Sequence, residues 1–397
     1  MNEKIEEIKK ELIDNKIKHI YLTFVDFSGE LRTKTVGVQE LINNTHVSWL
    51  DGISINGSLI NDFKNDKSSD WLVIIPDPYS FRILSFINDD TQKSAIMMCS
   101  IKNFKLDTRS KLTEAFQEFR DNNLTPVFGT QLIYKIEDNK QEFYSSQIMS
   151  ESNIFNNNVV NCLLDSNIDV EYYLPYGKYH NRIDLVPDIA VNAADKYTFA
   201  KLFAKSLSII NNYPIEFKGF DDQNLSSCPI HASLWDENKK NNLFYDEKDE
   251  FELSDLGRKF INGVLYFEDF IYSVIVATTN SPVKTFKRQF STERDDSLIQ
   301  VPLYFKEKQK KDRIGWSKRC IYQAINSDCN IYLVLACFLY AGLYGIKNDM
   351  KNFENSNNKI LKKEELINYV DNNDYYRKKL GDEIISMIVK YLEEKYE

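Results

Sequence analysis

The strand-like segment at residues 127–134 contains the residue pair on which the chemical interpretation depends. Its sequence, VFGTQLIY, follows Pro126 and is mainly apolar and aromatic, which is typical of a β-strand. Residues two apart on a strand point to the same face, so Gln131 and Ile133 should lie side by side. An amide oxygen binds a hard cation weakly, and a hydrocarbon side chain does not bind it at all. This face of the strand is therefore poorly equipped to hold a metal ion.

The cysteines do not form a metal or disulfide motif. None of the six belongs to a Cys-x-x-Cys pair, and the only histidine within a few residues of a cysteine is His231. This spacing argues against a zinc site, and scattered cysteines are typical of a reducing compartment. No N-terminal run resembles a signal peptide, and the longest apolar run, residues 332–344, is too short to span a bilayer. We therefore expect a cytoplasmic protein without a membrane partner.

The overall charge argues against nucleic acid as a partner. The formal net charge is −9 and the isoelectric point is near 5.3. Binding to a phosphate backbone requires clustered lysine and arginine, whereas the basic residues here are interspersed with acidic ones. The densest basic run, residues 306–311, is better explained as a solvated loop.

Hydrophobic periodicity predicts a mixed α+β protein. A length of 397 residues suits two domains of unequal size. Apolar residues at helical spacing predict helices, and short apolar runs bounded by turn residues predict strands. Helices are expected at residues 1–16, 108–123, 193–211, 253–278, 331–346 and 364–397, the last interrupted around Asn372 and Asn373. Strands are expected at residues 18–25, 31–38, 79–86, 94–101 and 127–136, and residues 137–158 are expected to form an exposed connection.

Eight motifs in order along nearly the whole chain resemble those of glutamine synthetases. They are HIYLTFVDFSGELRTKTV (19–36), DGISING (51–57), SDWLVIIPDP (69–78), DTR (107–109), AAD (193–195) followed by Lys201, FING (260–263), TNSP to FKR (279–288) and YLVLACFLYAGLYGI (332–346). Each motif is weak alone, but their shared order identifies the chain as a member of this family.

The resemblance implies a two-domain fold and an assembly. The fold is a small N-terminal β-grasp domain, placed at residues 1–104, and a large C-terminal α/β domain with a curved antiparallel sheet, placed at residues 105–397. Family members form rings in which each active site lies between the small domain of one subunit and the large domain of its neighbour. A ring-type homo-oligomer, or a mixed assembly with a true glutamine synthetase, is therefore expected.

The family's metal positions are all changed here. In the family, five glutamates and one histidine hold two Mg²⁺ or Mn²⁺ ions, which bind ATP and substrate. By the resemblance, Gln131 and Ile133 replace the first two glutamates, and the other four positions fall on Tyr176, Arg182, Pro229 and Ile321, with a one-residue gap that leaves Tyr176 open. Arg182 brings a permanent positive charge, which could partly substitute for a metal charge. The resemblance therefore implies no metal site and no ATP or metal cofactor.

Positions that contact phosphate and substrate are changed as well. Two arginines that contact ATP phosphates and the reacting centre in the family correspond to Asp295 and Gln300. A substrate-contacting arginine corresponds to Gln323. A small shift in register could instead bring in Arg313 or Arg319.

Four residues are retained at family substrate positions. Asp51 matches the ammonium-site aspartate, His231 matches the second histidine of its motif, and Lys287 and Arg288 match the segment before the substrate flap. Structural roles stay open: Asp51 begins a turn, Arg288 could pair with an internal carboxylate, and a lone histidine is often structural. After Arg288 the chain is about ten residues shorter than in the family, which removes the flap that shields the reaction from water. Glu293 could be a relic of that flap.

The leading hypothesis is a glutamine synthetase homologue without catalytic activity. It has lost the ATP- and metal-dependent glutamate–ammonia ligase reaction and acts as a binding, regulatory or structural protein, with a small amino-acid-like ligand possible. The alternative is an enzyme with altered chemistry, an amino-acid or amine ligase or transferase, whose candidate polar groups are Lys178, His180, Arg182, His231, Arg288 and Glu293. Their convergence on one pocket would favour this alternative. A conventional metal-dependent glutamine synthetase is the third and weakest hypothesis.

Overall fold

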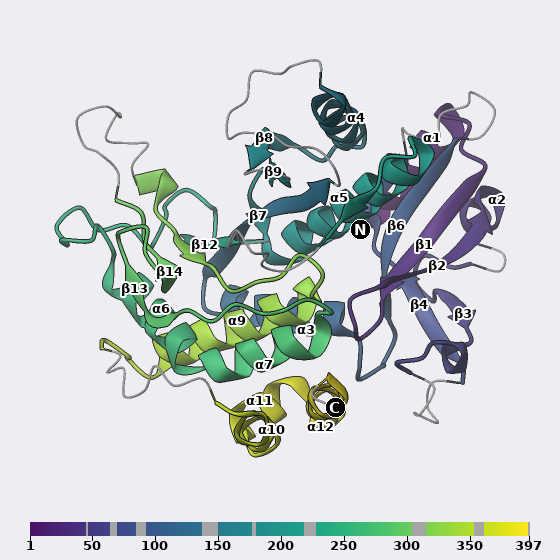
Figure 1. Cartoon of the computed structure of the whole chain (residues 1–397). Coiled ribbons are helices and arrows are strands. Elements are labelled where there is room, and N and C mark those ends of the chain that lie inside the picture. Colours follow the sequence, from purple (N-terminus) through teal and green to yellow (C-terminus); the bar gives the residue numbers. More distant parts are fainter. Residues whose placement is uncertain are drawn as a thin grey trace.

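Two β-sheets and a set of covering helices make up the protein (Figure 1). The computed structural model describes residues 1–44, 47–63, 70–84, 93–136, 150–176, 180–217, 228–303, 315–352 and 361–395. The predicted α+β class is confirmed, with a β-rich N-terminal part and a larger C-terminal part built around a curled sheet. The predicted domain boundary, after residue 104, lies between the last strand of the first sheet and the helix that precedes the second.

The N-terminal sheet is six-stranded within the described residues. Its order is β2-β1-β6-β4-β3, with β5 paired to β6, and its only parallel pair is β1 with β6. The strands are β1 (His19–Val25), β2 (Leu31–Gly37), β3 (Ile53–Ile55), β4 (Leu72–Pro76), β5 (Arg82–Leu84) and β6 (Ser94–Ile101). Helix α1 (Asn2–Asp14) buries Ile5, Ile8 and Leu12, which recur at helical spacing, and the short helix α2 (Val38–Ile42) follows β2.

The turn between β1 and β2 connects the two parts of the molecule. Gly29 has a φ of +90°, and a Cβ atom there would lie 2.9 Å from the Cα atom of Asn330. This close approach requires glycine. The Asn330 side-chain amide donates to the backbone oxygens of Asp26 and Phe27, at 3.3 and 3.0 Å.

The large sheet is nine-stranded within the described residues and is antiparallel except for the pair β13–β14. Its order is β13-β14-β15-β12-β7-β9-β8, and the short strands β10 and β11 also pair with β7. The strands are β7 (Leu124–Ile136), β8 (Val170–Tyr176), β9 (His180–Leu185), β10 (Asp188–Ile189), β11 (Ile215–Glu216), β12 (Ile230–Asp236), β13 (Lys287–Ser291), β14 (Ser297–Gln300) and β15 (Cys320–Tyr322). The long strand β7 is central, and the candidate residues Gln131 and Ile133 lie on it.

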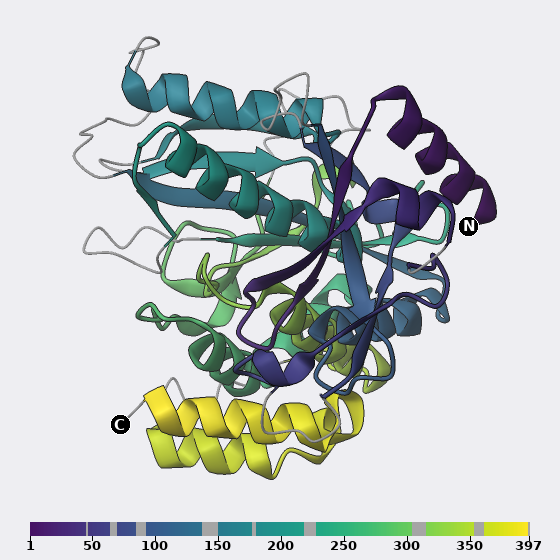
Figure 2. The ribbon, with the colours of Figure 1, turned by 90° about the vertical axis from the view of Figure 1, so that its right-hand side faces the viewer.

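Helices cover the large sheet. They are α3 (Thr108–Arg120), α4 (Glu151–Asp165), α5 (Ala190–Ile210), α6 (Asp255–Tyr266), α7 (Glu268–Thr278), α9 (Ile331–Lys347), α10 (Lys363–Asp371), α11 (Asp374–Leu380) and α12 (Asp382–Lys395). In Figure 1, α4 and α5 lie in the upper part of the molecule and the others below them. Helix α9 is almost wholly buried. It packs closely on α6, where a Cβ atom on Gly345 would lie 2.1 Å from the Lys259 backbone oxygen. The C-terminal helices pack below α7 (Figures 1 and 2).

Three helical segments differ from the sequence expectation. Residues 151–158, expected to be part of an exposed connection, begin helix α4, because the Ser150 side chain caps the helix by accepting from the Asn153 N–H and an apolar face that includes Phe155 and Leu163 is buried. The remainder of that connection, residues 137–149, lies outside the described residues. The helix expected at 253–278 is two helices, α6 and α7, bent by 59°. The C-terminal helix is broken twice, at Asn372–Asn373 as expected and again at Gly381.

Membrane-spanning potential is weak in the part of the chain that the structure describes. No single helix there is long and apolar enough to cross a bilayer. The bent pair α6–α7 meets that test by length and composition, but most of its residues are buried in the protein.

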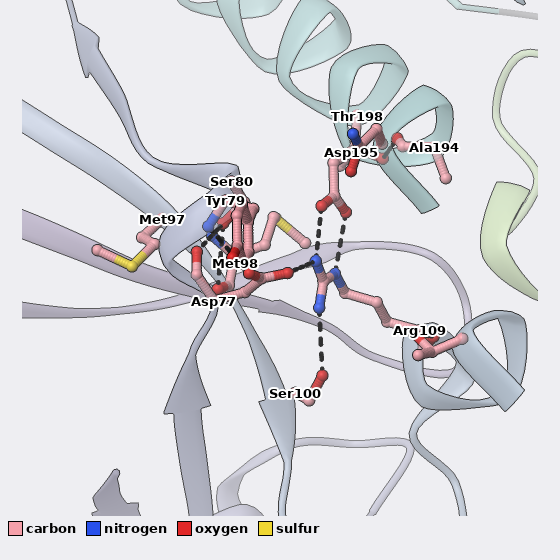
Figure 3. Close-up of polar contacts among 12 residues, drawn as sticks. Asp77, Tyr79, Ser80, Met97, Met98, Ser100, Arg109, Ala194, Asp195 and Thr198 are labelled. Atoms are coloured by element: carbon pink, nitrogen blue, oxygen red, sulfur yellow. Dashed lines mark hydrogen bonds and ion pairs between the residues drawn. The ribbon is translucent and has the colours of Figure 1, made fainter. Parts of the chain in front are cut away.

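A buried ion network joins the N-terminal sheet to the helices of the large part (Figure 3). The Arg109 guanidinium on α3 donates two hydrogen bonds to Asp195 on α5, at 3.0 and 2.7 Å. It also donates to Asp77, just after β4, at 2.5 Å, and to Ser100 on β6 at 3.2 Å. The Tyr332 hydroxyl on α9 donates to Asp195 at 2.8 Å. Four of the motifs that carried the family resemblance therefore meet in one structural cluster, which we call the junction network.

Candidate functional site

Strand pairing places the changed metal positions of β7 and β9 on one face of the large sheet. Gln131 pairs with Asp184, and Ile133 pairs with Arg182. Residues directly opposite each other on paired antiparallel strands project to the same face. The Arg182 guanidinium therefore lies next to the hydrocarbon side chain of Ile133. Gln131 and Ile133 of β7 are almost fully buried.

The same face continues across the neighbouring strands. On one side His231 of β12 pairs with Gly129 of β7 and with Ile321 of β15. Ile321 in turn pairs with Gln300 of β14. On the other side Tyr176 of β8 pairs with His180 of β9, two residues from Arg182. Pro229 is buried two residues before His231, and Gln323 follows two residues after Ile321. We call this surface the cleft face.

An arginine–aspartate ion pair lies at the middle of the cleft face. Arg182 Nε donates to Asp184 Oδ1 at 2.5 Å, and its Nη2 donates to Asp184 Oδ2 at 2.6 Å. Gln131 Nε2 also donates to Asp184 Oδ2, at 2.9 Å. Arg182 Nη2 further contacts the Tyr172 hydroxyl at 2.9 Å, and the guanidinium lies 5.6 Å from the ring centres of Tyr172 and Tyr176. Both oxygens of the carboxylate are therefore already occupied by donors of the protein itself.

Asp184 is a residue that the sequence analysis missed. Asp184 is 4% exposed, and its carboxylate neutralises the Arg182 guanidinium through two parallel hydrogen bonds. A signal was available, because an arginine and an aspartate two residues apart on a strand share a face and attract each other.

His231 is surrounded by hydrogen-bond donors. Its Nδ1 accepts from Arg319 Nε at 3.0 Å, and its Nε2 lies 3.2 Å from Gln131 Nε2. Gln131 must present its NH₂ group here, because the same nitrogen donates to Asp184. A neutral imidazole has one N–H group and one nitrogen that accepts. Because a donor of the protein faces each ring nitrogen, the imidazole N–H group points at another donor. The cluster has more donors than acceptors.

Charged groups of both signs lie on or beside the cleft face, namely Arg182, Arg319, Asp184 and Glu171. Burial, followed by the charges of Arg319 and Arg182, lowers the pKa of His231 well below its usual value, so the imidazole is neutral at pH 7. Burial and the neighbouring Asp184 raise the pKa of Glu171, at the edge of the cluster. Two guanidinium groups thus face one fully buried carboxylate.

The donor set does not fit two divalent cations. Among the residues described here, no group of three or more histidine, cysteine, aspartate or glutamate side chains lies close enough to hold a metal ion. Hard divalent cations take several oxygen ligands, and carboxylates supply most of them in proteins.

Arg319, which the sequence analysis left open as an alternative, contacts the cleft face through His231, whereas Ile321 holds the paired position opposite His231. Arg313 and Lys178 lie outside the described residues. Of the six candidate groups for an altered enzyme, Arg182 and His231 come together, and His180 is buried nearby on β9. Arg288 instead forms an ion pair with Asp269 of α7.

The remaining candidate residues lie at exposed positions. Asp51 is in a turn, where its carboxylate accepts from the Ser48 hydroxyl at 3.3 Å. Lys287 and Glu293 are exposed. Asp295 accepts from the Ser297 N–H at 2.9 Å, and hydrogen bonding to Ser297 lowers the pKa of Asp295. The Gln300 amide donates to the Asp295 backbone oxygen at 3.4 Å, so the two positions that carry arginine in the family contact each other here.

Comparison with known proteins agrees with this architecture. A solved structure described as a novel glutamine synthase homolog has a TM-score of 0.82 at 14% identity, covering 96% of this chain and 94% of the other, and so shares its fold. The family model described as glutamine synthetase, catalytic domain, matches residues 104–373.

Curated relatives carry the same family name. A glutamine synthetase from Thermotoga maritima is 26% identical over 378 residues, covering 87% of this chain and 81% of the relative. One from Methanococcus voltae is 24% identical over 437 aligned positions, covering 96% of this chain and 93% of the relative. The chain belongs to the glutamine synthetase family.

Proposed function

We propose that this protein is a glutamine synthetase homologue that has lost the ATP- and metal-dependent glutamate–ammonia ligase reaction. The observation that carries the proposal is the position of Arg182, whose guanidinium lies beside Ile133 on the cleft face and pairs with Asp184. A permanent cation occupies the face on which the family gathers its metal ligands.

The electrostatics of this arrangement disfavour a metal strongly. A divalent ion about 5 Å from a guanidinium would meet a repulsion of about 7 kcal/mol at an effective dielectric constant of about 20. The charge of Asp184 offsets part of this repulsion, but the Asp184 oxygens are engaged by Arg182 and Gln131. Ile133 and Ile321 have no atoms that could bind a metal ion. Phosphoryl transfer needs the metal charge, because catalysis of that reaction depends mainly on positioning and charge stabilisation.

Two measurements test the loss of activity directly. A γ-glutamyl hydroxamate assay with Mn²⁺, run beside an active glutamine synthetase, should give no product. A thermal melt with Mg²⁺ and ATP should show no stabilisation, since a ligand that does not bind the folded state cannot shift the transition. Hydroxamate formation, or a rise in Tm of several degrees, would refute the proposal.

We further propose a binding role in the cytoplasm, in nitrogen metabolism. The donor excess around His231 favours a ligand rich in acceptors, such as the carboxylate of a small amino-acid-like molecule. A ring of identical subunits, or a mixed ring with an active glutamine synthetase, is the proposed assembly, and it rests on family membership. Native mass measured alone and after mixing with an active glutamine synthetase tests it.

A second candidate function is an enzyme with altered chemistry, an amino-acid or amine ligase or transferase. One observation favours it: His231 is neutral and lies in the same cluster as Arg182, so a base and an anion-binding group are close together. Consumption of ATP or transfer of an amine in a panel of amino acids would support this candidate. Replacing His231 by Asn should then abolish the turnover.

A further inference from the structure

A cavity lies at the junction between the two parts of the molecule, away from the cleft face. Its volume is about 150 Å³, and it is bordered by the β1–β2 turn, helix α5 and the start of α9. One water molecule needs only about 10–15 Å³ measured in this way, so the cavity has room for a small ligand. Its lining includes Gly29, Glu30, Lys201, Lys205, Ile331 and Tyr332.

Two lysines of α5 line this cavity without an anionic partner. Lys201 and Lys205 are one helical turn apart, so their charges repel each other. The Lys201 ammonium lies 5.9 Å from the ring centre of Tyr197 and 5.7 Å from that of Phe217, and Lys205 lies 5.9 Å from the latter ring. Within the residues the structure describes, neither ammonium group forms a hydrogen bond or an ion pair, and each lies near an aromatic ring. Lys196, on the same helix, is different, because it pairs with Asp188 at 2.8 Å.

Burial and the charge of Lys205 lower the pKa of the Lys201 ammonium. Glu30, Asp328 and Cys329 act in the opposite direction, but neither carboxylate forms an ion pair with Lys201. Removing an ammonium from water without a hydrogen-bonded counter-charge is unfavourable. A bound anion would relieve this cost for Lys201 and would reduce the repulsion between Lys201 and Lys205.

The start of helix α9 adds a third attractive element. Ile331 and Tyr332 are the first two residues of this 17-residue helix, and both line the cavity. The N-terminal end of a helix carries a partial positive charge and directs backbone N–H groups outwards, which favours anions. The lysines of α5 and the end of α9 therefore favour negative charge in the same space.

We propose that this cavity binds a small oxyanion, either a phosphate or a carboxylate, between Lys201, Lys205 and the N-terminal end of α9. Such a ligand lies beside Gly29 of the β1–β2 turn, and so it bridges the N-terminal sheet and the large part. The Glu30 carboxylate also lines the cavity and opposes an anion, so the two lysines and the end of α9 must outweigh one negative charge. The proposal does not depend on whether the cleft face is active.

Calorimetric titration of the full-length protein tests this site, with inorganic phosphate in one arm and succinate in the other. Binding of phosphate alone identifies a phosphate ligand, binding of succinate alone identifies a carboxylate, and binding of both supports a general oxyanion site. Lys201→Met should raise the Kd about tenfold or more, because one charge-assisted interaction is lost. Lys205→Met, at an exposed position, should weaken binding in the same direction.

Two control variants separate this site from other cationic sites. Lys196→Met removes a lysine that already has a partner, so it should retain the wild-type Kd. Arg182→Met alters the cleft face and shows whether an anion binds there instead. The proposal is overturned if neither anion binds, if Lys201→Met and Lys205→Met bind as the wild type does, or if Arg182→Met is the variant that loses binding.

Discussion

The junction network is built around the buried Arg109 and the cleft face around the partly buried Arg182, and the charge balance of the two clusters differs. In the junction network, Arg109 faces two carboxylates, those of Asp77 and Asp195. On the cleft face, Arg182 and Arg319 share a cluster that contains one fully buried carboxylate, that of Asp184. Arg109 therefore faces two carboxylates, whereas Arg182 pairs with a single carboxylate that it shares with the Gln131 amide.

The two clusters also differ in how closely their residues match the family motifs. The junction residues belong to motifs that match the family, and the structure uses them to connect the N-terminal sheet with α3, α5 and α9. On the cleft face, Arg182 pairs with Asp184 at positions where the sequence departs from the family motifs. The contacts that connect the two parts of the fold are therefore separate from the residues of the cleft face.

The largest effect is expected from breaking the junction network. Arg109→Met leaves Asp195 buried without its cation, and breaking a buried pair in this way costs about 3–5 kcal/mol of unfolding free energy. Urea denaturation measures the loss. Arg377→Met, which removes exposed pairs with Asp371 and Asp382, is the control and should change stability by at most about 1 kcal/mol. Equal effects of the two variants would contradict the structural role assigned to Arg109.

Glu268 is a buried carboxyl group that belongs to neither the junction network nor the cleft face. Burial raises the pKa of Glu268 to about 8, although the Tyr322 hydroxyl donates to it at 2.9 Å. The folded state therefore holds a proton that the unfolded state releases above its ordinary pKa of 4.5. The stability that this group contributes is complete below that value and is lost as the pH rises towards 8, by up to about 1.4 kcal/mol per pH unit.

Glu268→Gln should remove this pH dependence. Unfolding free energies of both proteins, measured by urea at intervals between pH 5 and 8, should differ in slope. If the unfolding free energy of the wild type depended on pH in the same way as that of the variant, Glu268 would be ionised in the folded protein.

A smaller effect is expected from the ion pair of the cleft face. Arg182→Met leaves Asp184 with only the Gln131 amide and the Tyr172 hydroxyl, and should cost about 2 kcal/mol, because a partly exposed site still admits water. The double variant Arg182→Met/Asp184→Asn should recover most of this loss, since no buried charge remains. Additive destabilisation in this double-mutant cycle would mean that the two residues do not act as a pair.

The smallest effect is expected when carboxylates are restored without removing the arginine. Gln131→Glu/Ile133→Glu should show no shift of Tm with Mn²⁺, because Arg182 competes for both new carboxylates. Adding Arg182→Glu removes that cation and should produce a measurable Mn²⁺-dependent rise in Tm. A rise already present in the first variant would show that Arg182 is not what excludes the metal.

Local patterns predicted much of the fold because they reflect local physics. The apolar spacing of Leu112, Ala115 and Phe119 corresponds to the buried face of α3, and the run at 127–136 is the central strand β7. Helix α4 was missed because its many asparagines conceal the periodicity of Phe155, Val159 and Leu163.

The cleft face was predictable only in part. The Arg182–Asp184 pair follows from spacing along one strand, and a closer reading could have found it. The contact between His231 and Arg319 depends on the pairing of β12 with the three-residue strand β15, which no local pattern encodes. The same limit applies to Arg109 and Asp195, which are separated by 86 positions in the chain.

The central place of β7 has a consequence for how the protein is made. Its neighbour on one side, β9, follows about 50 residues later, and its neighbour on the other side, β12, follows about 100 residues later, so at synthesis rates of about 5–20 residues per second both edges stay unpaired for several seconds. An apolar strand with open edges is a template for association with other chains. The nascent polypeptide therefore passes through an aggregation-prone interval, and yields in expression should improve with a holding chaperone, which covers the open strand edges until β9 and β12 have been made.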